Sequence, residues 1–234
     1  MGILGSKHTD NKENGKEVFH FPTSKNALII FTRNPELGKC KTRLAATVGD
    51  EIALEIYTFL LRHTAKISAG VQADKFVYYS EQLHENDVWD TTKFRKKVQH
   101  GDDLGARMEQ AFNEIFSLGY QRAIIIGSDM YDMNTNDLDN AFETLEKNKF
   151  VLGPAEDGGY YLLGMKEVKP EVFKNKTWGT DTVLQATINN LKDESLILLQ
   201  EKNDVDYYED IKDVDAFHQF LPVHLTVKTS NKTT

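Results

Sequence analysis

The sequence predicts an α/β fold in which a mostly parallel sheet is covered by helices on both faces. The first observation is a set of short, continuous apolar runs, which are typical of buried parallel strands. Ala27–Thr32 and Ala123–Ile126 are the clearest of these runs. The second observation is that stretches with apolar residues at helical spacing lie between the runs. Strand-like and helix-like segments therefore alternate along the chain.

Two helices are expected between the strands of the first half of the chain. The longer one covers about Asp50–Ser68, where mostly apolar residues recur at helical spacing. The residues that set this spacing are Ile52, Leu54, Ile56, Phe59, Leu60 and His63. Phe76–Tyr79 and Phe94–Val98 are the expected second and third strands. Asp103–Leu118 is the second expected helix, because its apolar residues share one face.

The second half of the chain repeats the alternation. Asp137–Asn148 is expected to be a helix, with Asn or Thr just before it as the N-cap, and Thr180–Leu191 is expected to be another. The further expected strands are Phe150–Leu152, Tyr160–Leu163 and Leu196–Leu199. In sheets of this kind, ligands bind beyond the carboxyl ends of the strands. The loops that follow strands are therefore where the chemistry is expected.

The chain has 234 residues, which fits one large α/β domain. We assign that domain to residues 25–222. Residues 1–24 are polar and show little periodicity, so a flexible leader is expected there. Residues 223–234 are expected to form a similar tail, apart from a short strand.

Composition excludes several functions. The net charge is −8 and no dense Lys/Arg run occurs, so binding to long nucleic acid is not expected. No apolar run is long enough for a membrane span, and residues 1–26 show no signal peptide. Cys40 is the single cysteine, which excludes an intramolecular disulfide and a Cys-rich zinc site. A reducing, cytoplasmic location is expected.

The loop after the first strand is basic and contains a glycine. Thr32–Leu44 includes four basic residues together with Gly38. A strand, a basic loop with Gly and then a helix start form a phosphate-binding arrangement, in which backbone N–H groups and cations meet the anion. The loop is not a P-loop, because Arg33 and Cys40 stand where that motif needs Gly and Ser or Thr. Lys41 and Arg43 are the main candidates for anion binding, and a solvated basic turn is the alternative.

Carboxylates follow the strongest strand. Ile126 leads into Gly-Ser-Asp, so Asp129 is expected at the carboxyl edge of the sheet. One or two carboxylates plus substrate phosphates normally hold Mg²⁺, and Asp129 is therefore the candidate metal ligand. A helix cap or turn is the alternative role, and Asp132 is the nearby competitor for the metal.

Two more acidic segments are candidates. In the first, Asp157 precedes Gly158, Gly159 and Tyr160. Paired glycines allow close approach to a ligand or simply make a turn, so Asp157 is a candidate for a metal, a sugar hydroxyl or an acceptor. In the second, Asp206 follows the last strand and would complete a metal pair with Asp129. A solvated acidic loop is the equal alternative.

Two predicted helix starts add candidates. Asp103 either caps its helix or joins the site, and Arg107, one turn later, either reaches a ligand or lies on the surface. Trp178 and Thr180 precede another helix. Trp178 would stack on a sugar or base, or pack in the core. The seven histidines show no ligand spacing, so none is assigned to a metal.

These segments, taken in order, resemble a known bacterial family. The ordered motifs are Phe31–Leu44, Asp103–Met108, Gly127–Asp129, Pro154–Tyr160 and Trp178–Thr180. The sequence resembles the radical-SAM/selenodomain-associated glycosyltransferases, which belong to the GT-A-like nucleotide-diphospho-sugar transferase superfamily. The resemblance spans Ala27–Phe217 and implies a three-layer αβα sandwich.

The resemblance also implies roles for residues. Asp129 stands where the superfamily holds its metal, and Lys41-Thr42-Arg43 is similar to a loop that contacts nucleotide phosphates in related guanylyltransferases. Asp204-Val205-Asp206 looks like the superfamily's late Asp-x-Asp segment. The predicted phosphate site also includes Arg33, Gly38, Asp103 and Arg107. The predicted substrate site consists of residues 157–160, Trp178 and Thr180. The chain departs from the family at Met130 and at Tyr207–Tyr208, where Pro and Thr-Pro are usual.

Three functions compete on these grounds. The first is glycosyl transfer from a nucleotide sugar to a small-molecule acceptor, with Asp129 and Asp206 holding Mg²⁺ or Mn²⁺. Lys41 and Arg43 would neutralise the departing diphosphate, and Asp157 would bind the sugar or act as base. The second is nucleotidyl transfer from an NTP with release of pyrophosphate. The third is nucleotide binding without turnover.

Overall fold

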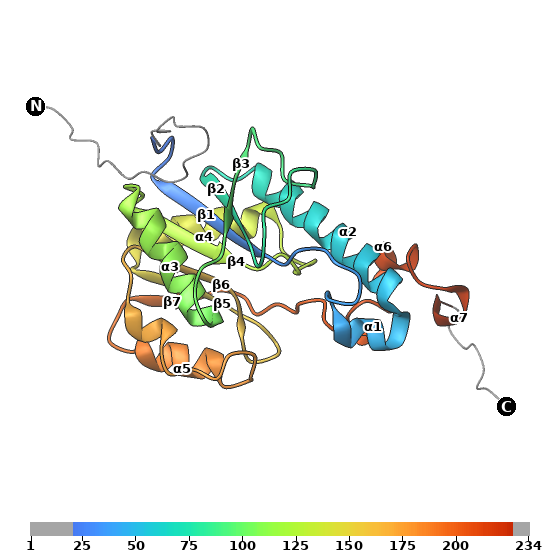
Figure 1. Cartoon of the computed structure of the whole chain (residues 1–234). Coiled ribbons are helices and arrows are strands. Elements are labelled where there is room, and N and C mark those ends of the chain that lie inside the picture. The colour runs from blue at the N-terminus through green and yellow to red at the C-terminus, as the bar shows by residue number, and fades with distance from the viewer. Residues whose placement is uncertain (1–20, 227–234) are drawn as a thin grey trace, which may run out of the picture.

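The structure is a computed structural model that describes residues 21–226. One seven-stranded sheet runs through it in the order β3-β2-β1-β4-β6-β5-β7 (Figure 1). β6 is antiparallel to β4 and β5, and the other neighbouring strands are parallel. The strands are β1 Asn26–Thr32, β2 Asp74–Tyr79, β3 Phe94–Val98, β4 Arg122–Ile126, β5 Phe150–Pro154, β6 Tyr160–Met165 and β7 Leu196–Leu198. The predicted mostly parallel α/β sheet is confirmed.

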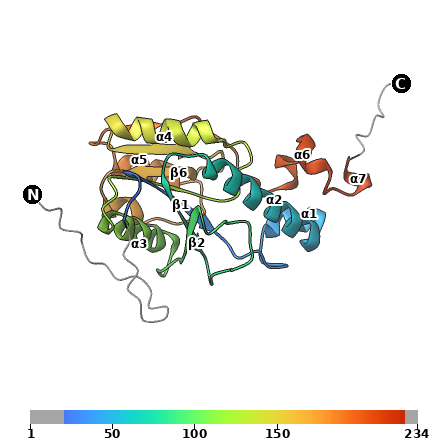
Figure 2. The ribbon, with the colours of Figure 1, turned by 90° about the horizontal axis from the view of Figure 1, so that it is seen from above.

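Helices cover both faces of the sheet. Figure 2 shows α4 on one side and α3 on the other, with strands between them. The α-helices are α1 Thr42–Val48, α2 Asp50–Ala69, α3 Leu104–Ser117, α4 Thr135–Lys147, α5 Val183–Asn190, α6 Asp215–His218 and α7 Val223–Thr226. Two short 3₁₀ helices are η1 Pro170–Phe173 and η2 Tyr208–Asp210. Among the described residues, no helix has both the length and the apolar character to cross a membrane.

Alternation along β1 explains the three layers. Successive side chains of a strand point to opposite faces, and all of Ala27, Leu28, Ile29 and Ile30 are fully buried. Leu28 and Ile30 join the core under α2 and α4. Ala27 and Ile29 join the core under α3 and η1. Because both faces of the central strands are covered by helices, these strands read as continuous apolar runs.

A third core lies beyond the end of the sheet. Leu44 of α1 and Ile56 of α2 pack with Val205, Ile211 and Phe217 from the C-terminal segment. Figure 1 shows α1 and α6 together at this end of the molecule. This core fixes the segment that carries the late acidic residues against the helix that follows the basic loop.

Local signals set the element boundaries. Asn134 caps α4 in a capping box with Asp137, as the sequence predicted. Gly49, with a φ of 89°, separates α1 from α2. The expected leader lies mostly outside the described residues, but Thr23 hydrogen-bonds Asp74 within them. The expected short strand in the tail is wrong where the structure describes it, because residues 223–226 form α7.

Candidate functional site

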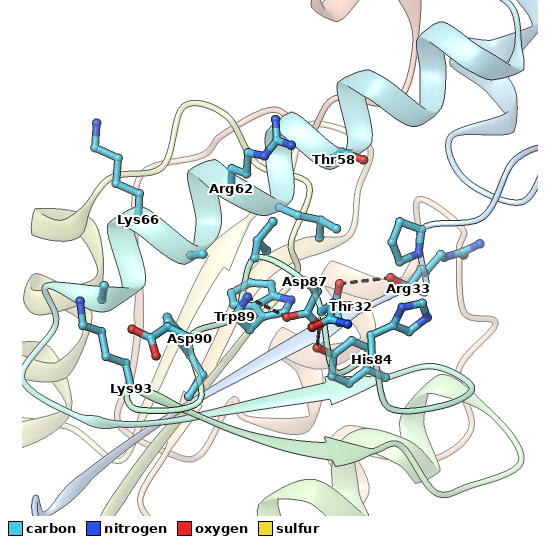
Figure 3. A pocket seen from close by; sticks show the side chains of 18 residues that line it. Thr32, Arg33, Thr58, Arg62, Lys66, His84, Asp87, Trp89, Asp90 and Lys93 are labelled. Carbon is cyan, nitrogen blue, oxygen red and sulfur yellow. Dashed lines mark hydrogen bonds between the residues drawn. The ribbon is translucent and has the colours of Figure 1, made fainter.

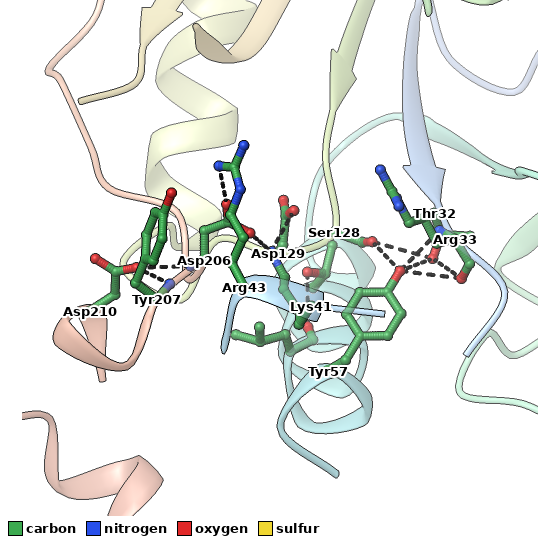
Figure 4. Close-up of polar contacts among 12 residues, drawn as sticks. Thr32, Arg33, Lys41, Arg43, Tyr57, Ser128, Asp129, Asp206, Tyr207 and Asp210 are labelled. Atoms are coloured by element: carbon green, nitrogen blue, oxygen red, sulfur yellow. Dashed lines mark hydrogen bonds and ion pairs between the residues drawn. The ribbon is translucent and has the colours of Figure 1, made fainter. Parts of the chain in front are cut away.

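The site is built where two neighbouring parallel strands end. β1 and β4 pair side by side, so the loops that follow them meet at one edge of the sheet. Lys41, from the loop after β1, places its Nζ 3.0 Å from Oδ2 of Asp129 (Figure 4). The same Nζ lies 3.7 Å from Oδ1 of Asp206. The three segments that the sequence singled out are therefore joined by one ammonium group.

Lys41 is held in an uncommon backbone conformation. Its φ of 49° and ψ of 47° lie in the left-handed region, and it is the N-cap residue of α1. Non-glycine residues rarely adopt this region, and such residues cluster at functional sites. The side chain is only 6% exposed. The backbone turn thus directs a buried cation toward the two carboxylates.

Arg43 adds a second, more exposed cation. Its Nη1 lies 2.8 Å from Oδ2 of Asp206, and its guanidinium carbon lies 5.5 Å from the centre of the Tyr207 ring. That ring provides a surface on which the guanidinium rests. Figure 4 shows both cations facing the acidic segment from the start of α1.

The charges in the cluster shift each other's pKa. Burial lowers the pKa of Lys41, but the charge and hydrogen bond of Asp129 outweigh it, so the pKa lies above its ordinary value. Burial raises the pKa of Asp129, but Lys41 outweighs it and the pKa lies below the usual range. Asp204 behaves differently: burial, and then repulsion from Asp129, raise its pKa to about 6. The cluster therefore has more negative than positive charge.

A buried polar network connects the loop after β1 with the loop after β4. The Oη of Tyr57, on α2, accepts the backbone N–H of Arg33 at 2.9 Å and donates to the carbonyl of Arg33 at 3.2 Å. The same hydroxyl lies 3.3 Å from Oγ of Ser128 and 3.3 Å from Oγ1 of Thr32. Burial raises the pKa of Tyr57, so it stays a hydroxyl. This network links the residue before Asp129 to the end of β1.

A cavity of about 250 Å³ lies beside the charged cluster. Three carboxylates, those of Asp129, Asp157 and Asp204, line it. Its apolar wall consists of Phe31, Leu104, Met108, Ile125, Ile126, Met130, Tyr160, Tyr161, Trp178 and Val183. None of its lining residues is basic. The cavity suits a neutral group with hydroxyl or ring atoms, while the cations stay at its edge.

The predicted glycine-rich loop forms one side of this cavity. Oδ1 of Asp157 accepts the backbone N–H of Gly159 at 2.8 Å. Gly158 has a φ of 83°, and a Cβ there would come within 2.5 Å of the backbone of Asp181. Its carbonyl accepts the N–H of Leu184. Glycine is thus required here for backbone packing against the start of α5, and Asp157 and Gly159 are left lining the cavity.

Trp178 lies between the cavity and the core. It lines the cavity and also packs against the core under α3. Gly105 makes this packing possible, because a Cβ there would lie 2.2 Å from the carbonyl oxygen of Phe173 and 2.6 Å from the Trp178 ring. Thr180 lines the cavity too, and its hydroxyl donates to the carbonyl of Thr177 at 2.8 Å.

None of the six predicted phosphate-site residues lines this cavity. Lys41 and Arg43 belong to the charged cluster beside it, and the other four lie elsewhere. Asp103 caps α3, where its carboxylate accepts the N–H of Ala106 at 2.7 Å, and the Nε of Arg107 donates to the carbonyl of Gly101 at 3.0 Å. Gly38 is exposed in a turn with a φ of 72°. Arg33 lines a different cavity, although its charge lowers the pKa of Asp129.

Cys40 has a packing role. It is buried, and its Sγ donates to the carbonyl of Asn34 at 3.2 Å. Burial is the largest cause that raises the pKa of this thiol, which leaves it a poor nucleophile.

The acidic residues fit a hard divalent cation. Among the described residues, no group of three or more His, Cys, Asp or Glu side chains is arranged to hold a metal by itself. Mg²⁺ needs only one or two carboxylates when phosphate oxygens complete its shell. Oδ2 of Asp129 and Oδ1 of Asp206 lie 3.0 Å and 3.7 Å from the Nζ of Lys41, so both carboxylates face the point that the ammonium group occupies. The competing Asp132 is exposed and does not line the cavity.

Sequence reasoning missed Asp204 as a lining residue. It precedes Asp206 by two positions, with the buried Val205 between them. The N–H of Val205 donates to the carbonyl of Asp129 at 3.2 Å, which brings this segment alongside the loop after β4. The Asp-x-Asp pattern is visible in the sequence, but only Asp206 was predicted from it as a candidate, although the same pattern contains Asp204.

Known proteins share this fold. The crystal structure of a protein from Desulfovibrio desulfuricans G20, assigned as a nucleotide-diphospho-sugar transferase, is 30% identical, with 79% of this chain and 84% of that chain covered and a TM-score of 0.75. A 4-diphosphocytidyl-2C-methyl-D-erythritol synthase from Anaerococcus prevotii DSM 20548 is 10% identical, with 84% and 96% covered and a TM-score of 0.54. The CMP:2-keto-3-deoxy-manno-octonic acid synthetase complexed with CTP is also 10% identical, with 82% and 98% covered and a TM-score of 0.52.

The sequence comparisons are narrower. No curated protein sequence matches the chain. The model of one family, described as "Uncharacterized protein conserved in bacteria (DUF2064)", matches residues 63–180, which is half of the chain. The chain therefore belongs to the DUF2064 family and has the fold of the nucleotide-diphospho-sugar transferases.

Proposed function

We propose that this protein is a metal-dependent transferase that acts on a nucleotide-diphosphate donor, and that it transfers a glycosyl group from a nucleotide sugar. One observation carries the proposal: the Nζ of Lys41 lies 3.0 Å from Asp129 and 3.7 Å from Asp206 at the edge of a cavity. This arrangement combines two carboxylates for a cation with a positive group for a diphosphate. The ordered motifs extend the proposal to the radical-SAM/selenodomain-associated glycosyltransferase family.

Each charged residue has a role in the proposal. Asp129 and Asp206 would hold Mg²⁺ or Mn²⁺, which, when bound, would neutralise charge on the diphosphate. Lys41 already contacts both carboxylates, and Arg43 contacts that of Asp206. With a donor bound, the two cations would neutralise the departing nucleoside diphosphate, on which negative charge develops in the transition state.

The cavity would receive the neutral part of the substrates. Trp178 offers a ring face on which a sugar or base stacks, and Asp157 offers a carboxylate for a sugar hydroxyl. The pKa of the Arg43 guanidinium is raised first by Asp206 and to a smaller extent by the charge of Asp157, so Asp157 would lie near the proposed diphosphate. It is therefore our candidate base for the acceptor hydroxyl.

Nucleotidyl transfer is the second candidate. The basic loop directly follows β1, and the same cations would stabilise departing pyrophosphate. The fold is also shared with a synthetase that was crystallised with CTP. In this version, an acceptor phosphate or hydroxyl attacks the α-phosphorus of an NTP.

Product analysis tests these alternatives. A thermal-shift screen of nucleotides and nucleotide sugars with Mg²⁺ and Mn²⁺ identifies the donor, since ligands that bind only the folded state raise its apparent stability. Turnover of that donor with an acceptor panel then identifies the reaction. Release of nucleoside diphosphate supports glycosyl transfer, and release of pyrophosphate supports nucleotidyl transfer. Binding with no turnover would leave a nucleotide binder and contradict the enzyme proposal.

A matched pair of variants tests the metal role. Asp129→Asn should abolish the metal-dependent part of nucleotide binding while the circular dichroism spectrum stays unchanged. Asp132→Asn, three positions along the chain, should bind as the parent does, because Asp132 does not line the cavity. Unchanged metal dependence in Asp129→Asn would remove Asp129 from the metal site.

A further inference from the structure

A second and larger cavity lies on the other face of β1. Phe31 lines the cavity of the proposed active site, whereas the next residues, Thr32 and Arg33, line this one. It measures about 690 Å³ and runs between α2 and the connection from β2 to β3 (Figure 3). Its size falls within the range of small-molecule sites, roughly 300–1,000 Å³. We call it the α2 groove.

The wall of the α2 groove is a fixed structure. Asp87 and Lys96 form an ion pair at 2.8 Å, and their side chains are only 11% and 10% exposed. Asp87 also accepts the hydroxyl of Tyr79 and the backbone N–H of Trp89. Lys96 donates to the carbonyl of His84 at 2.6 Å. One buried ion pair and its hydrogen bonds therefore hold the residues of this wall together.

Four cations line the α2 groove. Arg33 comes from the end of β1, Arg62 and Lys66 lie one turn apart on α2, and Lys93 precedes β3 (Figure 3). All four are exposed, and none forms an ion pair with any residue that the structure describes. Figure 3 shows Lys66 and Lys93 at one end of the groove and Arg33 at the other, so positive charge lies along its whole length.

Acidic side chains do not cancel this charge. The carboxylate of Asp87 is already paired with Lys96. Asp90 accepts two hydrogen bonds from Thr92, and its pKa is lowered first by those bonds and only last by the charge of Lys93. One acidic group therefore stands against four unpaired cations, and the lining carries a net positive charge.

The floor of the groove joins apolar surface to one unsatisfied polar atom. Leu61, Trp89 and Phe94 line it and are buried. The ring of His84 stacks on that of Tyr79 at 6.0 Å. The Nε2 of His84 is buried and has no hydrogen-bond partner in the described chain. Buried polar atoms normally have a partner, so this lining residue keeps one ring nitrogen without a hydrogen bond.

We propose that the α2 groove binds a small molecule that carries a phosphate group on an apolar or aromatic body. Arginine and lysine at the mouth match the several oxygens of a phosphate. The apolar floor, with Trp89, matches a ring or short hydrocarbon body. This site is separate from the proposed active site, and the proposal does not depend on the proposed function.

The two tryptophans of the chain make the test specific. Trp89 lines the α2 groove and Trp178 lines the active-site cavity. The two indole N–H signals in a ¹⁵N-labelled spectrum therefore report the two cavities separately, and Trp178→Phe assigns them. Phenyl phosphate should shift the Trp89 signal in a saturable way. Phenol and inorganic phosphate, which each supply half of the recognised chemistry, should bind at least about 10-fold more weakly, a difference of about 1.4 kcal/mol.

A charge-matched pair of double variants completes the test. Arg62→Ala/Lys66→Ala should weaken phenyl phosphate binding by about 10-fold or more. Lys147→Ala/Lys192→Ala removes two exposed cations outside the groove and should bind as the parent does. The proposal fails if phenyl phosphate leaves the Trp89 signal in place, if it shifts only Trp178, or if both double variants lose binding equally. Nucleotide turnover by the parent is unaffected by any of these outcomes, so the active-site proposal is judged independently.

Discussion

The Nζ of Lys41 lies 3.0 Å from Oδ2 of Asp129, although 88 positions separate the two residues in the sequence. The lysine is 6% exposed and the aspartate 38% exposed. The pair is therefore asymmetric: the cation is withdrawn from water and the anion remains open to a ligand. An incoming metal and diphosphate would contact the exposed carboxylate of Asp129 first. The ammonium group of Lys41 lies next to that carboxylate and would then contact the diphosphate.

Lys41→Met should destabilise the protein by about 1–2 kcal/mol at neutral pH. Breaking a fully buried pair costs about 3–5 kcal/mol, and the exposure of Asp129 reduces that figure. The pKa of Asp129 is lowered in the folded state, so its stabilisation is present above the ordinary value of about 4 and is lost as pH falls through the lower folded pKa. Urea unfolding at pH 7 and pH 3 should show the deficit shrinking in acid.

Lys39→Met is the control for that measurement. Lys39 lies in the same loop but is exposed, and Glu36 is its ion-pair partner. Its urea midpoint should match that of the parent protein. A deficit in Lys41→Met that stays the same at both pH values would contradict the assigned pairing with Asp129.

Arg43→Ala should lower turnover by roughly 10- to 100-fold without changing the thermal midpoint. The guanidinium is exposed, so it contributes little to folding, whereas a cation aimed at developing charge contributes to the transition state. Arg43→Lys keeps the charge but loses the planar group over the Tyr207 ring. Its turnover should therefore lie between that of the parent and that of Arg43→Ala. Steady-state kinetics with the identified donor measures this, and equal kcat values for all three proteins would exclude Arg43 from the reaction.

Tyr57→Phe should destabilise the protein by about 1–3 kcal/mol, because it removes a buried hydroxyl and leaves the N–H of Arg33 without its partner. Turnover should fall as well, since the loops after β1 and β4 lose their connection through Ser128. Tyr131→Phe is the matched control: that ring packs against Phe217, and its hydroxyl makes no hydrogen bond within the described chain. Denaturant unfolding of the two variants in parallel measures the difference.

Much of the fold follows from the sequence because the sheet is buried on both faces. Runs such as Ala27–Thr32 are continuously apolar, as strands buried on both faces are, and they predict strands directly. The meeting of Lys41 with Asp129 was also predictable in outline, since the carboxyl ends of neighbouring parallel strands share one edge. The sequence did not indicate that β6 runs antiparallel, because an apolar run carries no information on strand direction.

Other features depend on contacts that no local pattern records. The left-handed backbone conformation of Lys41 occurs at the N-cap of α1, where the loop joins the helix. The placement of Asp204 in the cavity depends on the third core, where Val205 packs with Phe217. The α2 groove depends on the route of residues 81–93, which is set by the ion pair of Asp87 with Lys96. Each of these needs the tertiary structure.

Gly105→Ala should destabilise the protein by about 1–3 kcal/mol through overpacking and should weaken donor binding. The new methyl would lie 2.2 Å from the carbonyl oxygen of Phe173 and 2.6 Å from the Trp178 ring, so Trp178 must move in the cavity. The indole N–H signal of Trp178 should shift while that of Trp89 stays. Gln110→Ala, on the exposed side of the same helix, should change neither signal, and an unmoved Trp178 signal in Gly105→Ala would contradict the packing described.

Asp204→Asn should raise the thermal midpoint of the ligand-free protein above pH 6 and leave it unchanged near pH 4. Burial and then the charge of Asp129 raise the pKa of Asp204 to about 6, so ionising it in the folded state costs more than in the unfolded chain, where the pKa is about 4. The parent therefore loses stability as pH rises from about 4 through 6, and an amide removes that loss. Differential scanning fluorimetry of both proteins across this range measures it; a midpoint that falls equally in the variant would mean that another group titrates there.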